Sequence, residues 1–289
     1  MSLQRTKLFD LDLINDSNFD ATIASMLNFQ NEYDPHGDKL PLLFTPNVDD
    51  VVKLNEKQYT DLANILKKCF YIIPDGQPLI WASKLVRSPL KRRLPGSELF
   101  PLLWKELIKN NKRIMVIAPN DQVGELLKKE YANMVYYVPP FFDVENQDEL
   151  KKVIEGCIPL FDEFKPEYVF LGIRFPKQNH IALGLIEHVR QSAVFGPESS
   201  VGSLQSSVGS LQSSVHSRQS SVEKMPLFLL LGASYEFYLN IKKRAPAFWQ
   251  KIGMEWFYRF TQEPGRLFKR YFVDDLKFFP IVLREFRKK

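Results

Sequence analysis

The sequence contains few of the residues that build disulfide frameworks or metal centres. Its 289 residues include two cysteines, Cys69 and Cys157, and four histidines, whose spacing matches no metal-ligand pattern. No window approaches an uninterrupted run of about eighteen apolar residues, the length that would suggest a membrane span. We therefore expect a protein with no bound metal and no membrane span, in a reducing, cytoplasmic compartment.

Glycine-rich phosphate-binding motifs are also missing. No Gly-x-Gly-x-x-Gly follows a predicted strand, and the chain has no P-loop. These absences argue against a dinucleotide-dependent oxidoreductase and a P-loop nucleotidase, and we expect no cofactor. Hydrophobic residues nevertheless make up 45% of the chain, which is enough to build one large α/β domain, with or without an appendage.

The basic residues are concentrated at the end of the chain. Residues 242–289 hold 13 Lys and Arg against 5 Asp and Glu, whereas the other 241 residues hold 26 against 29. A basic end beside a mildly acidic body indicates an anionic partner for that end. Nucleic acid, a phosphorylated ligand and an anionic lipid surface all fit this description.

Short apolar runs alternate with helical patterns along most of the chain. The runs that predict strands are 8–14, 40–47, 69–76, 112–120, 134–142, 167–176 and 225–234. Because wholly apolar strands separated by helices are typical of a parallel sheet covered on both faces, we predict a Rossmann-like α/β fold. We assign residues 1–240 to this α/β catalytic domain and 241–289 to a C-terminal basic helical appendage.

Two segments depart from the alternating pattern. Residues 199–222 read SSVGSLQSSVGSLQSSVHSRQSSV, a seven-residue repeat with too little apolar surface to offset chain entropy, so we predict a disordered insertion over about 197–223. After residue 240, aromatic residues alternate with Lys and Arg. Pro246, Gly253 and Pro264 there suit helix starts and a break.

Polar and small residues follow several of the predicted strands. In open parallel sheets, ligands bind beyond the carboxyl ends of the strands, where loops and helix N-termini converge. The residues at these ends include Thr45, Asn47, Asp75, Gly76, Gln178, Gly232 and Ser234. They predict a single cleft, although Pro, Gly, Asn and Asp also favour turns for reasons of backbone geometry alone.

Asp75 is notable because it separates two apolar segments in YIIPDGQPLIWA, residues 71–82. One interpretation is an Asx turn or a cap for the helix that begins near Gln77. The other is a general base at the cleft, with a proton affinity raised by partial burial. Asn47 is either a hydrogen-bonding group that orients the ligand or a turn residue, whereas turning explains Gln178 less easily.

Several motifs, in order, resemble the WecG/TagA/CpsF family of bacterial glycosyltransferases. They are TPNVD (45–49), IPDGQPLIWA (73–82), LPGSELF (94–100), FLGIRFPKQN (170–179), LLGASYEF (230–237) and KRAPAFWQKIGMEWFYRFTQEPGRLFKRY (243–271). The resemblance runs from about residue 8 to 273, interrupted by the serine-rich repeat. The last block is the most specific, with its Glu-Trp-x-x-Arg centre and Glu-Pro-x-Arg-x-x-x-Arg-Tyr finish.

The resemblance implies an inverting transfer from a UDP-sugar to a polyprenyl-diphosphate-linked saccharide, in cell-surface polysaccharide synthesis at the cytoplasmic face of the plasma membrane. The sugar is a hexose or N-acetylhexosamine, and in much of the family it is N-acetylmannosamine. Asp75 matches the family's proposed base. The positions expected to bind donor or acceptor are Thr45, Asn47, Gly76, Gln178, Gly232, Ser234 and Glu236, and those expected at the lipid diphosphate are Arg259, Arg266 and Arg270.

Three departures from the family pattern leave the donor sugar open. Glu98 replaces the usual Asp, Asn179 the usual Glu, and Tyr235-Glu236 the usual Phe-Asp. No Asp-x-Asp motif lies beside a strand end, so we expect a metal-independent route in which backbone amides, Arg and Lys stabilise the leaving diphosphate.

The C-terminal block also suggests a surface for an anionic membrane. Residues 264–272 form an amphipathic basic pattern, and residues 276–289 are the better candidates for membrane contact. Alternatively, the aromatic residues around Trp256 pack on the body. Homo-oligomers are possible. Two rival hypotheses are a nucleic-acid-binding α/β protein, which the strand-end acid disfavours, and a noncatalytic relative of the family.

Overall fold

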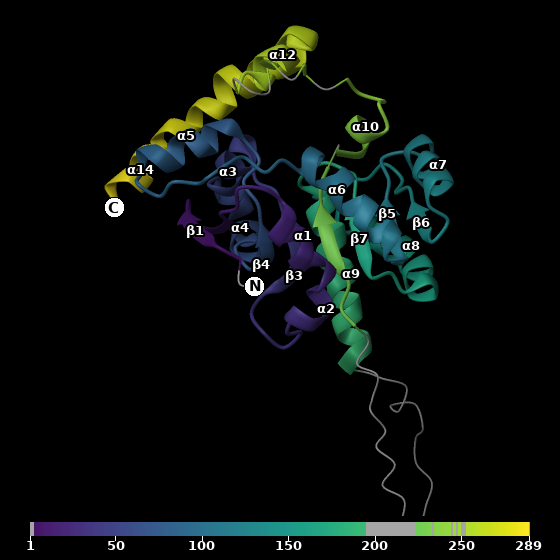
Figure 1. Cartoon of the computed structure of the whole chain (residues 1–289). Helices are drawn as coiled ribbons and strands as arrows, with labels where there is room; N and C mark the ends of the chain where they lie inside the picture. Colours follow the sequence, from purple (N-terminus) through teal and green to yellow (C-terminus); the bar gives the residue numbers. More distant parts are fainter. Residues whose placement is uncertain are drawn as a thin grey trace, which may run out of the picture.

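A parallel β-sheet forms the centre of the molecule. The computed structural model describes residues 3–194, 224–232, 234–243, 245–246, 248–249 and 253–288, and the predicted insertion at 197–223 lies outside these ranges. Within them, the strands of this sheet are β3 (Leu40–Phe44), β4 (Cys69–Ile72), β5 (Ile114–Ile117), β6 (Met134–Tyr137), β7 (Tyr168–Leu171) and β8 (Leu227–Leu230). They lie in the order β4-β3-β8-β7-β5-β6, and each neighbouring pair is parallel (Figure 1).

Helices connect the strands and cover both faces of the sheet. They are α3 (Val48–Leu54), α4 (Thr60–Leu66), α5 (Gln77–Leu85), α6 (Gly96–Lys109), α7 (Asp121–Glu130), α8 (Gln147–Phe164) and α9 (Lys177–Val194), with α10 (Ser234–Tyr238) after the last strand. Connections that run in opposite directions along the sheet place their helices on opposite faces, because parallel crossovers are right-handed. The α/β fold with a parallel sheet is therefore confirmed.

Aromatic side chains show which helix covers which face. Phe100 of α6 packs on Phe170 of β7, with ring centroids 5.5 Å apart, and on Tyr235 of α10 at 4.7 Å. On the other face, Phe161 of α8 stacks on Phe228 of β8 at 6.3 Å. Phe228 pairs in register with Val169, the neighbour of Phe170, so the two phenylalanines point to opposite faces.

The N-terminal segment differs from the prediction. Residues 8–14 were expected to form one strand, but β1 (Arg5–Leu8) and β2 (Leu11–Ile14) form an antiparallel hairpin. Its two turn residues, Phe9 and Asp10, have φ of 54° and 58°, as a tight two-residue hairpin turn requires. The sequence lacks the Gly or Asn that usually signals such a turn. Two short helices, α1 (Asp20–Leu27) and α2 (Phe29–Glu32), follow.

The C-terminal helices run along α5, on one side of the sheet (Figure 1). They are α12 (Glu255–Gln262), α13 (Pro264–Lys269), a π-helical turn (Arg270–Asp274), a 3-10 turn (Asp275–Lys277) and α14 (Phe278–Arg287). The predicted domain boundary near residue 240 stays a prediction. None of the described helices is long and apolar enough to cross a bilayer.

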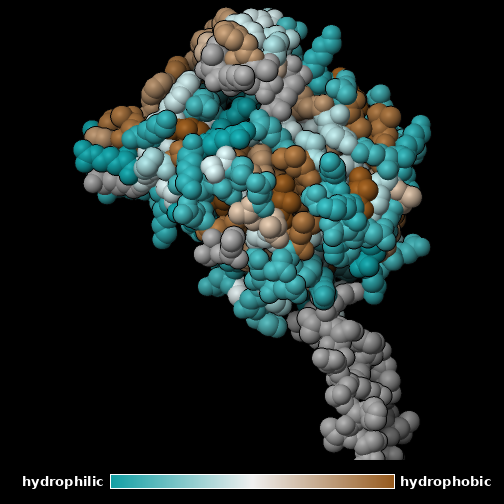
Figure 2. Space-filling model, in the orientation of Figure 1, coloured by the Kyte–Doolittle hydropathy of each residue, from teal (hydrophilic) through white to brown (hydrophobic). Residues whose placement is uncertain are grey.

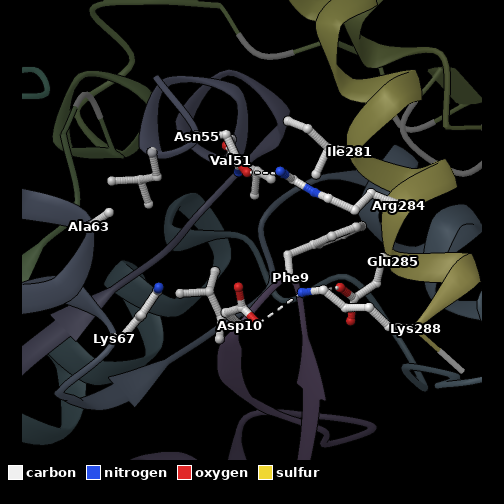
Figure 3. Close-up of a pocket in the computed structure, with 12 residues that line it drawn as sticks. Phe9, Asp10, Val51, Asn55, Ala63, Lys67, Ile281, Arg284, Glu285 and Lys288 are labelled. Atoms are coloured by element: carbon white, nitrogen blue, oxygen red, sulfur yellow. Dashed lines mark hydrogen bonds and ion pairs between the residues drawn. The ribbon is translucent and has the colours of Figure 1, made fainter. Parts of the chain in front are cut away.

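The last helix, α14, contacts the body from its first residue to its last turn. Figure 3 shows α14 side chains pointing toward the hairpin turn and the end of α3, where they surround a small pocket. Lys288 pairs with Asp10 at 3.2 Å, and Arg284 donates a hydrogen bond to Asn55. Phe278 packs edge-on against Phe9, with ring centroids 5.3 Å apart. The C-terminal segment is therefore held to the body at both polar and apolar contacts.

Candidate active site

Asp75 lies where the carboxyl ends of two neighbouring strands meet. Its backbone N–H donates to the Pro46 carbonyl at 2.9 Å, which ties the segment after β4 to the segment after β3. Its Oδ2 accepts a 3.4 Å hydrogen bond from the N–H of Gly96, the first residue of α6. The partial positive charge of a helix N-terminus favours a carboxylate there.

The structure decides between the local roles considered for this region. The N-cap position of α5 is Gly76, and no side chain caps that helix, so Asp75 is not its cap. At the start of α6, Pro95 occupies the N-cap position, and no side chain caps that helix either. Asp75 instead contacts the start of α6, a helix that begins 21 residues further along the chain.

Three charged side chains surround the Asp75 carboxyl group. Burial raises the pKa of Asp75, and the negative charge of Glu255 raises it further, whereas Arg93, Arg259 and the Gly96 N–H lower it. Burial has the largest effect, so the net change in pKa is upward. A carboxylate with increased proton affinity is better suited to accept a proton from a sugar hydroxyl.

Arg93 and Glu255 are site residues that the sequence analysis did not identify. Arg93 Nη1 lies 3.0 Å from Glu255 Oε2, and Glu255 Oε1 accepts a 2.5 Å hydrogen bond from Arg259. Glu255 is the Glu of the Glu-Trp-x-x-Arg motif, which was the available signal for it. Arg93 belongs to a run of basic residues just before α6. Because its partner lies 162 positions away, no local pattern indicates that Arg93 belongs to the site.

A cavity of about 690 Å³ opens in front of these groups. Its polar end is formed by strand-end residues and by α12, and its other end by apolar side chains of α5 and of the C-terminal helices. The polar lining includes Asn47, Asp75, Arg93, Ser97, Ser234, Glu255, Arg259 and Arg270, and the apolar lining includes Trp81, Ala82, Leu85, Phe272, Leu276, Phe279 and Val282. One cavity thus joins a charged end to an apolar end.

Six of the predicted site residues line this cavity. They are Asn47, Asp75, Gly76, Ser234, Arg259 and Arg270. Asp75 and two arginines of the C-terminal segment therefore line one cavity. The catalytic and binding roles assigned to these residues stay predictions.

The other predicted site residues lie elsewhere. Thr45 Oγ1 donates to the Leu230 carbonyl at 3.4 Å, and buried Gln178 accepts a 3.2 Å hydrogen bond from the Gly232 N–H, so these three lie around the ends of β3 and β8. Glu236 pairs with Lys242 at 2.5 Å. The side chain of Arg266, on α13, is outside the described part of the structure.

Asn47 and Arg270 connect the body to the C-terminal helices. Asn47 caps α3: its Oδ1 accepts from the Asp50 N–H at 3.4 Å, and its own N–H donates to Asp50 Oδ2 at 3.0 Å. Arg270 Nη2 donates to the same Asn47 Oδ1 at 3.4 Å and lies 3.7 Å from Asp49. Asn47 is thus the cap of α3 and also lines the cavity, and its role toward a ligand stays a prediction.

The three departures from the family pattern have different surroundings. Glu98 pairs with Arg92 at 2.8 Å and lies 3.8 Å from Arg93, so it touches the charged cluster. Asn179 and Tyr235 are buried, and within the described residues neither the Asn179 amide nor the Tyr235 hydroxyl has a hydrogen-bond partner. In the same ranges, no group of three or more His, Cys, Asp or Glu side chains is arranged to hold a metal ion.

Comparison with known proteins identifies the class. Residues 8–197 and 210–289 match the glycosyl transferase WecG/TagA/CpsF family, and the chain belongs to this family. The stretch left unmatched, 198–209, falls within the predicted insertion at about 197–223.

Curated relatives carry a more specific name. A protein of Staphylococcus aureus strain MRSA252 is 26% identical over 200 residues, which cover 68% of this chain and 62% of the relative. A protein of strain MW2 is 25% identical over 229 residues, covering 78% and 71%. Both are named N-acetylglucosaminyldiphosphoundecaprenol N-acetyl-beta-D-mannosaminyltransferase. The chain therefore spans somewhat less than two thirds of the first relative's length.

Proposed function

We propose that the protein transfers a hexose or N-acetylhexosamine from a UDP-sugar to a polyprenyl-diphosphate-linked saccharide, with inversion at the anomeric carbon and without a metal. N-acetylmannosamine is the first sugar to test, because the relatives are named for its transfer to an undecaprenyl-diphosphate-linked N-acetylglucosamine. The observation that carries the proposal is the cavity itself, in which Asp75, Arg259 and Arg270 face the same space.

The proposed chemistry assigns a proton and a leaving group to separate side chains. Asp75 accepts the proton of the acceptor hydroxyl, while the oxygen of that hydroxyl forms a bond to the anomeric carbon of the donor. The bond from that carbon to the diphosphate oxygen breaks, and its electron pair leaves with UDP. Arg93 and the N-terminus of α6 supply positive charge beside Asp75, and positive charge stabilises a departing anion.

The apolar end of the cavity suits a lipid-linked acceptor. Trp81 and Leu85 of α5 are 49% and 62% exposed, and Phe279 of α14 is 68% exposed, although all three line the cavity. A polyprenyl chain would cover these side chains while its diphosphate meets Arg259 and Arg270, since guanidinium groups bind phosphates through paired hydrogen bonds.

The same helices offer a surface for an anionic membrane. Figure 2 shows apolar and polar side chains interleaved along the arm that the C-terminal helices form. Exposed apolar residues there include Phe268, Phe272, Leu276, Phe279, Leu283 and Phe286. Together with the exposed Lys269 and Arg287 they support peripheral attachment at the cytoplasmic face of the plasma membrane.

The test is the release of UDP by wild type and by Asp75→Asn. A panel of UDP-sugars is supplied with a short-chain polyprenyl-diphosphate saccharide, and thermal stabilisation of the enzyme by each UDP-sugar identifies the donor beforehand. We expect Asp75→Asn to lower kcat at least about 100-fold, the size of effect typical for a general base.

Asp61→Asn is the matched control, because Asp61 is an exposed residue of α4 outside the cavity lining. It should retain the wild-type rate. Equal kcat values for wild type and Asp75→Asn would remove Asp75 as the base. Wild-type protein that releases no UDP with any donor would favour a noncatalytic relative of the family.

A further inference from the structure

Glu255 is a buried carboxylate between two arginines from different parts of the chain. It is only 7% exposed. Its Oε2 meets Arg93, which precedes α6 in the body, and its Oε1 meets Arg259, one turn further along α12. Each carboxylate oxygen thus has its own guanidinium partner.

This arrangement has an energetic requirement. A carboxylate removed from water is tolerated when paired charges and hydrogen bonds replace its hydration. Arg93 is itself largely buried, with a side chain 16% exposed, so the pair is shielded from solvent. Loss of either partner would leave the other charge buried and unpaired, which is the expensive case. The pair therefore fixes α12 against the body at one position.

The ion pair of Glu255 and Arg93 also lies beside Asp75, the proposed base. The charged groups that face Asp75 are Arg93 from the segment before α6, and Glu255 and Arg259 from α12. The Gly96 N–H completes the set from α6 itself. Without Glu255, the base would face two guanidinium groups, and Glu98, 3.8 Å from Arg93, would be the remaining negative charge beside them in the described structure.

We propose that Glu255 is a positioning residue for the sugar transfer: it holds Arg93 and Arg259 in place at the cavity wall and balances their charge beside Asp75. This inference rests on the function proposed above. Glu255 does not touch the reacting atoms; it acts through its two arginines and through its charge.

The electrostatic part of the role has a definite sign. Glu255 raises the pKa of Asp75, and the arginines lower it. Removing the charge at position 255 therefore lowers the pKa of Asp75. A base with a lower pKa becomes deprotonated at lower pH, but it accepts a proton less readily in the transition state.

The experiment compares three variants by steady-state kinetics across a range of pH. In Glu255→Gln the charge is lost and the shape is kept; in Glu255→Asp the charge is kept and the reach is shortened by one methylene. Glu56→Gln is the control, because Glu56 also joins the body to the C-terminal segment, through Lys277 at 3.0 Å, but lies outside the cavity lining. UDP release is measured with varied acceptor concentration.

Glu255→Gln should move the ascending limb of the kcat/KM profile to lower pH, because the negative charge that raises the pKa of Asp75 is gone. Its plateau should fall at least about tenfold, and its acceptor KM should rise if Arg259 binds the lipid diphosphate. Glu255→Asp should keep the wild-type limb while its plateau falls, and Glu56→Gln should match wild type in both respects.

The inference would be overturned if Glu255→Gln kept both the ascending limb of the wild-type pH profile and the wild-type acceptor KM. It would also be overturned if the ascending limb of Glu255→Asp shifted as far as that of Glu255→Gln. If thermal unfolding shows that Glu255→Gln is not folded, Glu255→Asp decides alone, and an unchanged plateau overturns the role. Asp75→Asn in the same assay separates the two proposals. Full activity there defeats the proposed function, whereas a dead Asp75→Asn beside a wild-type-like Glu255→Gln defeats only the positioning role.

Discussion

Asp50 offers a direct test of the electrostatics beside the cavity. Its carboxyl group is buried beneath the first turn of α3, where Oδ2 accepts the Asn47 N–H, and burial raises its pKa from 3.8 to about 7. The Asn47 hydrogen bond, Arg270 and Lys53 all favour the charged form but do not cancel the desolvation. We predict that Asp50→Asn stabilises the protein at neutral and alkaline pH, because the amide keeps the shape and an acceptor oxygen without the buried charge.

The magnitude follows from proton linkage. Between pH 3.8 and about 7 the unfolded chain has lost this proton and the folded chain retains it, so the contribution of Asp50 to stability falls as pH rises. The contribution of Asp50 to the unfolding free energy is fully present below pH 3.8 and is lost as the pH rises through about 7. A pKa difference of about 3 units corresponds to about 4 kcal/mol. The gain from Asp50→Asn should thus grow by up to about 4 kcal/mol between pH 4 and pH 8.

The assay is denaturant unfolding of both proteins at several pH values, with the difference in unfolding free energy plotted against pH. Asp49→Asn is the matched control, because Asp49 pairs with Lys53 at 2.9 Å and lies 3.7 Å from Arg270. It should lose up to about 1 kcal/mol at neutral pH, opposite in sign to its neighbour. A stability difference for Asp50→Asn that does not change from pH 4 to pH 8 would refute the reasoning.

Two further predictions concern the hydrophobic parts of the molecule. Tyr235 is fully buried, and its hydroxyl has no hydrogen-bond partner among the described residues. Tyr235→Phe should therefore raise the unfolding free energy by up to about 1 kcal/mol. A decrease of that size would instead indicate that the hydroxyl has a partner. On α14, Phe279, Leu283 and Phe286 are 68%, 51% and 44% exposed. Replacing all three with Ser should weaken cosedimentation with anionic phospholipid vesicles about 100-fold, at about 1 kcal/mol for each half-buried side chain transferred to the lipid. Wild-type binding by the triple variant would place the membrane contact elsewhere.

The strands of the sheet could be predicted because their sequences are dominated by burial. IMVI in β5 and LFLL in β8 are wholly apolar and wholly buried, as strands covered on both faces must be. The hairpin at Phe9 and Asp10 could not, since neither residue is a usual signal for a turn with positive φ. Packing of the strands on each other overrides the local preference of these two residues.

Part of the candidate site followed from the rule that ligands bind at the carboxyl ends of parallel strands. That rule identified Asn47, Asp75, Gly76 and Ser234, all of which line the cavity. It could not find Arg93 or the role of Glu255, because their contact depends on how α12 folds back over the sheet. Trp81 of α5 lines the cavity although it is half exposed, and this position depends on the same packing.

Asn47 shows why the body and the C-terminal helices form one functional unit. Its side-chain oxygen accepts hydrogen bonds from both the Asp50 N–H of α3 and the guanidinium of Arg270. Arg270 is therefore positioned by a residue whose own conformation is fixed by the capping box of α3. Glu255 makes the second such link, to Arg93. These two connections help to hold the basic helices over Asp75, and apolar side chains of α5 and α14 line the same cavity. In the proposed reaction, the part of the protein that would bind the lipid is for this reason also the part that sets the charge around the base.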